Sequence, residues 1–405
     1  MDNVTHALAG LLIADAVVAA HRARGHALPD GARRTIVAAG VVTAELPDID
    51  LAWSGIGRGP ETLGYMLHHR GHTHTLVMAI AAALLVWGLA LAIRRDLRTT
   101  AASRATLAVA LLGTLSHIVL DWTNSYGVHP FWPWDNRWYY GDAIFIVEPW
   151  LWVVAIPLVV AGERTRVTRG LLAALLVAIL MAAWVTSFTT SAVAVALTAG
   201  AIASLVAAWR TRAPARALAR VAIAIGAWVA VEGVFFTAGR AAEAAVRAAV
   251  PAAVDDVVLS PGVADPFCWS AIVVWEDATT YHARGAEVRP VPALRAPTGC
   301  RTRAASGLDS VRLAGTATVR WTGEWTAPAG ALAALARRDC RLAAALRFMR
   351  VPAWRRVGTA TELWDLRYGA GGFASLASDG RGACPAGVPP WVPPRSRQLG
   401  HMSRD

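Results

Sequence analysis

The sequence predicts an α-helical membrane domain with six to eight spans, followed by a small extracytoplasmic α+β domain. Hydrophobic residues make up 55% of the chain and its mean hydropathy is +0.42, and the apolar excess lies in long uncharged runs, which is typical of membrane proteins. Basic residues gather in alternate loops between these runs. After about residue 240 the runs stop, and short mixed segments begin.

Six of the apolar runs are close in length to the roughly 20 residues that cross a bilayer as a helix. They are residues 76–93, 106–122, 143–161, 170–188, 191–209 and 217–236. Two earlier runs are shorter. Residues 4–20 are marginal for a span, and residues 35–46 are short enough to be a re-entrant segment, which is tolerated only when it is buried in protein.

Every basic residue is an arginine, and fifteen of them fall in the four loops at 22–34, 94–104, 164–169 and 210–220. The loops between these hold only Arg58, Arg70 and Arg137. Positive residues favour the cytoplasmic side, so this bias predicts that the polar motifs lie outside. A basic protein can also bind nucleic acid, but no basic stripe with interleaved aromatic residues is present, and we expect no nucleic-acid partner.

The composition divides the chain into four parts. Residues 1–160 form a membrane-embedded core, residues 161–240 add transmembrane helices, residues 241–384 form the extracytoplasmic domain, and residues 385–405 form a disordered tail rich in Pro and Arg. In the third part, residues 269–276, 316–321 and 361–368 resemble strands, and residues 329–345 one Ala-rich helix. Its four cysteines predict one or two disulfides, or else free buried thiols. They are Cys268, Cys300, Cys340 and Cys384.

Polar residues that can bind metal are concentrated near the N-terminus, where eight of the eleven histidines precede residue 118. Four short segments hold most of them. His6 lies at the start of the first run. Asp48 and Asp50 follow Pro47, and on an extended chain they point to one side. Residues 68–74 hold four histidines. His117 and Asp121 are four residues apart, which places them on one face of a helix.

Imidazole and carboxylate ligands suit Zn first, with Mn or Fe as alternatives. The four segments offer enough ligands for one divalent ion with supporting residues, or for two ions about 4 Å apart. Each segment also has a plainer interpretation: a helix end for His6, a solvated turn for Asp48 and Asp50, and a surface loop for residues 68–74. The pair His117 and Asp121 is harder to explain in this way, because ionisable groups inside a span are costly and usually functional.

An aromatic-rich loop follows at residues 126–142. It fits an aromatic belt at the lipid headgroups or a wall over the metal site. In the second case Arg137 could bind an anionic group, and Asp142 could act as a ligand or base. Glu148 either faces the metal site and supports its ligands or lies near the membrane interface. With Glu45, Arg137 and Asp142 are the candidate catalytic residues.

Five segments in fixed order resemble the YdjM-type family of membrane-bound metal-dependent hydrolases of bacterial inner membranes. They are DNVTHALAG (2–10), LPDID (46–50), HRGHTHT (69–75), HIVLDWTNSYG (117–127) and WYYGDAIFIVEP (138–149). The resemblance covers about the first 160 residues and implies a hydrolase with a divalent metal, but no substrate. It implies a functional set of eight residues, namely His6, Asp48, Asp50, His69, His72, His74, His117 and Asp121.

The leading hypothesis is therefore a metal hydrolase at the outer face of the inner membrane, which cleaves a phosphoester or ester of a lipid or lipid-linked molecule with metal-activated water. HExxH and GxSxG motifs are absent. One alternative is a non-catalytic envelope protein with a structural metal. Another is a transporter, which would need ionisable groups along several spans, whereas residues 170–236 hold few. The lipid bilayer is the expected partner, and the oligomeric state stays open.

Overall fold

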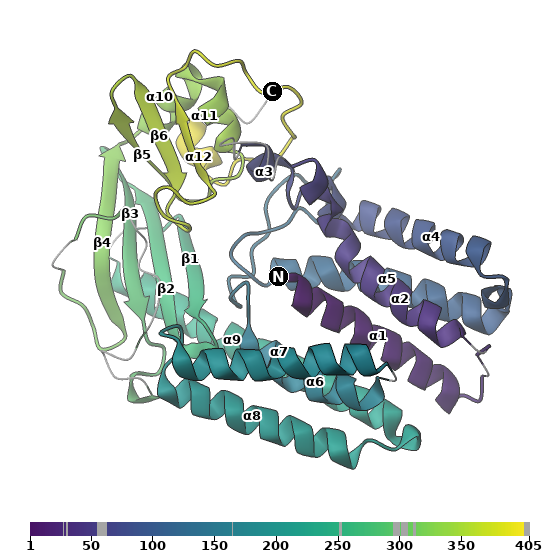
Figure 1. Cartoon of the computed structure of the whole chain (residues 1–405). Helices are drawn as coiled ribbons and strands as arrows, with labels where there is room; N and C mark the ends of the chain where they lie inside the picture. Colours follow the sequence, from purple (N-terminus) through teal and green to yellow (C-terminus); the bar gives the residue numbers. More distant parts are fainter. Residues whose placement is uncertain are drawn as a thin grey trace.

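The chain forms a helical membrane part and a β-rich domain that sits at one end of the helices (Figure 1). The computed structural model describes residues 1–400 except 27, 30, 55–62, 164, 251–252, 295–299, 301–306 and 311–312. Within these residues six helices are long and apolar enough to cross a membrane, which agrees with the predicted six to eight spans. They are α1 (Asn3–Ala23), α4 (Leu76–Ile93), α5 (Thr100–Trp122), α7 (Arg166–Val185), α8 (Ser191–Arg210) and α9 (Ala217–Ala249).

Two further apolar helices are shorter. Helix α2 (Ala32–Glu45) and helix α6 (Pro149–Gly162) have 14 residues each, so each rises about 21 Å. The apolar run predicted from residue 143 becomes helical only at Pro149, because Glu148 caps the first turn of α6 by accepting a hydrogen bond from the backbone N–H of Trp150. The marginal run at residues 4–20 lies inside the 21-residue helix α1.

The helices pack in two groups, α1, α2, α4 and α5 in one and α6 to α9 in the other (Figure 1), with α1 touching both. Helices α1 and α2 cross with their backbones in close approach. A Cβ atom added at Gly10 would lie 2.5 Å from the carbonyl oxygen of Gly40, and one added at Gly40 would lie 2.6 Å from that of Gly10. Small residues allow such contact between membrane helices, and the crossing fixes the start of α1 relative to the end of α2.

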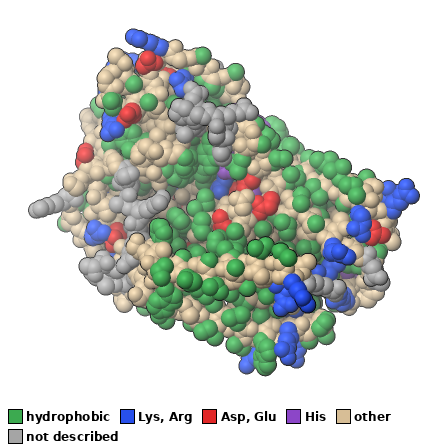
Figure 2. Space-filling view, viewed as in Figure 1, with side chains coloured by type: hydrophobic (Ala, Val, Ile, Leu, Met, Phe, Trp, Pro, Cys, Tyr) green, Lys and Arg blue, Asp and Glu red, His purple; other side chains and the backbone are tan. Residues whose placement is uncertain are grey.

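The connections α1–α2, α4–α5, α6–α7 and α8–α9 all lie at the end of the helices away from the β-rich domain (Figure 1). Arginine side chains gather at that end in Figure 2. Arg58 and Arg164 are outside the described residues. The Arg-rich loops of the sequence therefore lie together at one end of the helix bundle, and the β-rich domain lies at the other end.

The C-terminal part contains two antiparallel sheets. The first has the order β1 (Asp256–Gly262), β2 (Asp265–Glu276), β3 (Thr280–Val288), β4 (Val319–Pro328), and the second β5 (Pro352–Val357), β6 (Ala360–Asp365), β7 (Ser375–Ser378). Disulfides join Cys268 to Cys300 and Cys340 to Cys384. The single Ala-rich helix that we predicted is two helices, α10 (Ala331–Arg338) and α11 (Cys340–Ala345). They separate where Asp339 is extended and caps α11.

The tail differs from the predicted disordered segment over the residues that the structure describes. Residues 385–400 include the short helix α12 (Ser396–Leu399). Trp391 is only 1% exposed, and its indole N–H donates to the carbonyl of Leu67 at 3.0 Å. Composition rich in Pro and Arg predicted disorder, but one large apolar side chain with a polar tip is enough to dock the segment on the membrane part.

Candidate metal centre

Four chain segments converge at the end of the helices that faces the β-rich domain. Helix α1 contributes His6 and helix α5 contributes His117 and Asp121. The segment Leu46–Ala52 follows α2, and a second short segment, His72–His74, precedes α4. Both are 3₁₀ turns. The extended chain considered for residues 46–50 is therefore not formed, because the helical path of α2 continues through Pro47 as a 3₁₀ turn. Asp48 lies beside His74 Nε2 and His117 Nε2, whereas Asp50 lies beside His69 and the Nδ1 side of His74.

Four ligand atoms form a compact tetrahedron, and its members are Asp48 Oδ1, His74 Nε2, His117 Nε2 and Asp121 Oδ2. His74 Nε2 lies 3.1 Å from His117 Nε2, 3.1 Å from Asp121 Oδ2 and 3.4 Å from Asp48 Oδ1. His117 Nε2 lies 3.4 Å from the Asp121 oxygen and 3.5 Å from the Asp48 oxygen. These are five of the six edges, and the ligand atoms of the group all lie within 4.8 Å of one another. A regular tetrahedron with edges of about 3.3 Å has its centre about 2.0 Å from each corner, which is the bond length of zinc to nitrogen and oxygen ligands.

Hydrogen bonds on the far side of both imidazoles direct the Nε2 atoms toward that centre. His117 Nδ1 lies 2.6 Å from the carbonyl oxygen of Ala44 and so donates to it. His74 Nδ1 lies 3.0 Å from Thr73 Oγ1 and 3.3 Å from Asp50 Oδ2. A proton on each Nδ1 leaves a lone pair on each Nε2, which is the arrangement of metal-bound histidines.

The two carboxylate oxygens complete a set of four acceptors that face one point. Asp48 Oδ1 and Asp121 Oδ2 are buried and have no hydrogen-bond partner among the described residues. Buried acceptors directed at each other are unfavourable unless a cation lies between them. The donor set, its size and its unpaired oxygens therefore fit a divalent metal.

The charges around the tetrahedron also favour a cation. Burial by itself lowers the pKa of His74, but the nearby carboxylates of Asp121, Asp48 and Asp50 outweigh burial and raise the pKa to about 10. Burial raises the pKa of Asp48, yet His117 and His74 hold it well below its usual range. The carboxylates thus stay ionised and stabilise positive charge at this point, either as a proton on His74 Nε2 or as a metal ion that would replace that proton.

Arg70 is a member of the site that the sequence did not single out. It is buried, and its backbone has a positive φ of 55°. Its Nη2 lies 2.9 Å from Asp121 Oδ1, the oxygen that points away from the tetrahedron, where the α-amino group of Met1 also makes contact. Its Nη1 donates to Asn124 Oδ1 at 2.9 Å. Arg70 therefore orients the Asp121 carboxylate, and its only signal in the sequence was its place among the histidines.

Asp50 holds the histidine-rich loop together. Its Oδ1 accepts from His69 Nδ1 at 2.9 Å, and its Oδ2 accepts from the backbone N–H of Arg70 at 3.0 Å and from Thr73 Oγ1 at 2.7 Å. Asp48, Asp50 and His69 also form a second group whose ligand atoms lie within 4.8 Å of one another. The structure thus brings Asp50 and His69 next to the tetrahedron without making them part of it.

The other predicted ligands and catalytic residues have different surroundings. The ring of His6 stacks on His117 at 3.7 Å, and its Nε2 is 3.3 Å from Asp121 Oδ1, so His6 adjoins the tetrahedron. His72 packs instead between Trp132 and Trp391, outside both ligand groups. The predicted metal role of His72 has no support in this geometry, because the 3₁₀ turn directs His72 and His74 to different sides.

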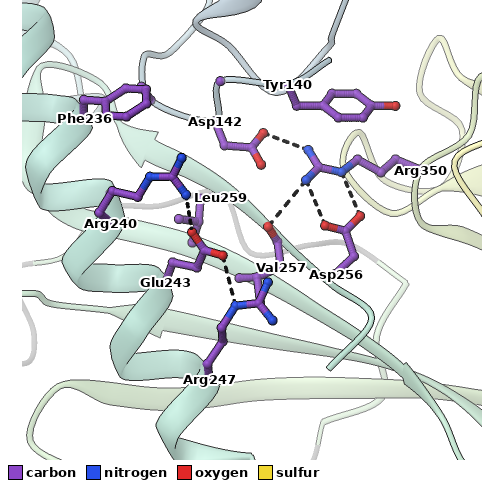
Figure 3. Close-up of a pocket in the computed structure, with 13 residues that line it drawn as sticks. Tyr140, Asp142, Phe236, Arg240, Glu243, Arg247, Asp256, Val257, Leu259 and Arg350 are labelled. Carbon is purple, nitrogen blue, oxygen red and sulfur yellow. Dashed lines mark hydrogen bonds and ion pairs between the residues drawn. The ribbon is translucent and has the colours of Figure 1, made fainter. Parts of the chain in front are cut away.

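The three candidate catalytic residues lie in three different places. Glu45 ends α2 next to Asp48 and accepts from the side-chain amide of Asn3. Arg137 is exposed and pairs with Asp135 at 2.6 Å. Asp142 pairs with Arg350 at 2.8 Å in a different cleft (Figure 3). Arg137 and Asp142 belong to neither ligand group. Glu148 is buried at the start of α6, where it caps the helix.

Comparison with known proteins covers the membrane part of the chain. No curated protein and no solved structure matches the sequence. Residues 1–192 match the family model described as YdjM inner membrane protein. This range includes every residue of the tetrahedron and its supporting partners. The membrane part of the chain, up to residue 192, is thus similar to the YdjM inner membrane protein family, the resemblance that the five sequence motifs indicate.

Proposed function

We propose that the protein is a membrane-bound metal-dependent hydrolase that acts at the extracytoplasmic face on a phosphoester or ester of a lipid or lipid-linked molecule. The observation that carries the proposal is the tetrahedron of four buried acceptor atoms, two of which have no hydrogen-bond partner among the described residues. The family match to residues 1–192 supports it.

Zinc fits the mixed nitrogen and oxygen ligands and the tetrahedral shape best. Asp48, His74, His117 and Asp121 would hold the ion. A divalent cation in such a site activates water at neutral pH and polarises the oxygen of the bond to be cleaved. The group of Asp48, Asp50 and His69 offers a place for a second ion.

Other residues of the chain would orient the ligands, admit the substrate and accept a proton. Arg70 and Asp50 orient Asp121 and His74. Among the four tetrahedron residues Asp48 is the most exposed, at 12% of its side chain, so substrate would approach from its side. Glu45 lies on that side and its Oε1 has no hydrogen-bond partner among the described residues, which suits it to accept a proton from water.

The surroundings of this opening support a lipid substrate. Acidic and histidine side chains are visible in a hollow between the helices and the β-rich domain, bordered by hydrophobic side chains (Figure 2). Val42, Ile49 and Trp53 on either side of Asp48 are about half exposed. Apolar surface beside a polar site suits a molecule whose reactive group is attached to a hydrocarbon tail.

One feature favours a second candidate function. Four protein ligands that close a tetrahedron are typical of structural zinc, whereas catalytic zinc keeps a position open. A structural site would stabilise the membrane part without turnover. In the hydrolase, Asp48 would have to release or share the ion to open a position.

The test combines metal analysis with turnover. Protein purified in detergent should contain one to two divalent ions per chain and cleave chromogenic phosphodiester or ester substrates. Asp121→Asn should lose both metal and activity, and His72→Ala should keep both. Wild-type protein without metal would reject the site. Bound metal without turnover under Zn, Mn or Fe would assign the site to a structural role.

A further inference from the structure

A second polar cleft lies where the membrane part meets the β-rich domain. It has a volume of about 150 Å³, and liquid water occupies about 30 Å³ per molecule, so the cleft has room for a group of several heavy atoms. One wall is α9 with Phe236, Arg240, Glu243 and Arg247, and the other wall contains Arg350 (Figure 3). No residue of either metal-ligand group lines it.

The cleft lies at the depth of the lipid headgroups. The apolar run of α9 extends from residue 217 to 236, and 20 helical residues span about 30 Å, the thickness of the hydrocarbon core. Arg240 follows one turn later. The rings of Trp122 and Phe236, 6.0 Å apart, lie beside this level, where aromatic side chains mark the membrane interface.

The α9 wall carries an excess of positive charge. Both carboxylate oxygens of Glu243 are occupied, one by Arg240 Nη1 at 2.9 Å and the other by Arg247 Nε at 3.0 Å (Figure 3). Two guanidinium groups therefore share one carboxylate. Each guanidinium has five N–H donors, and Arg240 uses one of them within the described residues, while Arg247 uses Nε and one bond from Nη1.

The opposite wall is fixed, and it is neutral when Arg395, which pairs with Asp256 from outside the lining, is counted with Arg350, Asp142 and Asp256. Arg350 binds Asp142 through Nη1 at 2.8 Å and Asp256 through Nε and Nη2 at 3.0 Å each. Its side chain is only 6% exposed, and Arg395 also contacts Asp256. An anion in the cleft would therefore bind the free donors on α9, which are 67% exposed at Arg240 and 43% exposed at Arg247.

We propose that this cleft binds the phosphodiester group of a phospholipid. Arg240 and Arg247 donate to the phosphoryl oxygens, as arginine does in many phosphate sites, and Phe236 lies on the side of the acyl chains. Glu243 holds the two guanidinium groups in place. This lipid site is separate from the metal centre, and lipid binding there does not depend on catalysis.

The segment that lines this cleft is hydrogen-bonded to the helix that carries part of the metal centre. The backbone N–H of Gly141 donates to the carbonyl of Trp122 at 2.7 Å, and that of Ala143 donates to the carbonyl of Thr123 at 2.8 Å. Trp122 directly follows Asp121. Residues 141–143, which line the cleft, are therefore held by two hydrogen bonds to the end of α5, the helix that carries two of the four tetrahedron residues.

The test measures binding of short-chain lipids to full-length protein in neutral detergent. Dihexanoyl phosphatidylglycerol should bind saturably, and the double variant Arg240→Gln/Arg247→Gln should weaken this binding at least tenfold. The matched control Arg210→Gln/Arg212→Gln removes two exposed arginines at the opposite end of the helices and should leave the affinity within twofold. Thermal unfolding and metal content establish that both variants are folded.

Two results would overturn the proposal. Equal binding by wild type and the Arg240/Arg247 variant would show that the cleft is not the lipid site. Inorganic phosphate or glycerol 3-phosphate that binds as tightly as the short-chain lipid would assign the cleft to a free anion. The single variant Arg247→Gln gives an independent check if the double variant does not fold, and it should weaken binding about threefold or more.

Discussion

At the scale of single residues, the site depends on groups that never touch the metal position. Asp50 accepts three hydrogen bonds from the loop that carries His74, and the carbonyl of Ala44 fixes the proton of His117. These contacts choose which imidazole nitrogen faces the tetrahedron. Such supporting partners commonly change metal affinity by 10- to 100-fold.

Asp50→Asn should therefore weaken metal binding by about 10- to 100-fold. An amide has one acceptor oxygen, so at least one donor of the loop would lose its partner and His74 would lose its orienting carboxylate. Competitive titration with a chromophoric chelator measures the dissociation constant. His72→Ala serves as the control, because His72 packs between two tryptophans outside the ligand groups. An unchanged constant in Asp50→Asn would contradict the assigned role.

The sequence identified the residue types of the site, but not which residues form the tetrahedron and which only support it. His117 and Asp121 were recognisable because a helix fixes their spacing. Asp48 and Asp50 were assigned to one side because we expected extended chain, and a 3₁₀ turn separates them. Arg70 was counted only as a loop charge, since its contact with Asp121 spans 51 positions of the chain. Local spacing cannot predict a contact of that kind.

At the scale of elements, the crossing of α1 and α2 sets the position of the site. The apolar runs at residues 4–20 and 35–46 marked where these helices lie, but both helices are longer than the runs. The close approach at Gly10 and Gly40 could not be predicted, because a glycine inside an apolar run gives no sign of which helix it faces. The start of α6 was also misplaced, since apolar residues 143–147 precede the cap at Glu148 and are not helical.

Gly10→Ala should destabilise the membrane part by about 1 to 3 kcal/mol, the usual cost of an overpacked contact. The added methyl group would lie 2.5 Å from a backbone oxygen of Gly40, so α1 must move and His6 with it. Gly88→Ala on α4 is the matched control, because no heavy atom lies within 4 Å of its added Cβ. Thermal unfolding in detergent compares the two. Similar stability for both variants would show that the helices can separate without cost.

At the scale of the whole molecule, Arg350 joins the two parts of the chain. It binds Asp142 in the membrane part and Asp256 in the β-rich domain. Burial raises the pKa of Asp256, but Arg350 and Arg395 outweigh burial and hold the pKa below its usual value of 3.8. Because the pKa is lower in the folded state, ionised Asp256 stabilises the fold above about pH 4, and this contribution is lost as the pH falls toward the folded pKa.

Asp256→Asn should cost about 3 kcal/mol at pH 7, since it leaves two buried arginines without their carboxylate. The difference from wild type should shrink below about pH 4, because Asp256 takes up a proton there in the unfolded chain while the folded protein keeps it ionised. Melting temperatures between pH 3 and pH 7 measure this. Arg355→Gln, which breaks an exposed ion pair with Glu362, should change stability by less than about 0.5 kcal/mol. A difference that stays constant with pH would refute the assignment.

The basic loops predict that the β-rich domain lies outside the cell membrane, where its two disulfides would also form. A protease added to intact spheroplasts should therefore remove an epitope tag placed after residue 400. A tag inserted between residues 211 and 216, at the Arg-rich end, should be cleaved only after the membrane is opened. The reverse pattern would invert the topology.

Trp391 has a consequence for how the protein matures. It donates to Leu67 and packs against His72 and His129, so the loop before His74 rests on a side chain synthesised more than 300 residues later. During translation that loop is complete long before the β-rich domain has been synthesised and has formed its disulfides. We expect the metal centre to acquire its final rigidity late, only after the C-terminal part has folded and Trp391 has docked on Leu67.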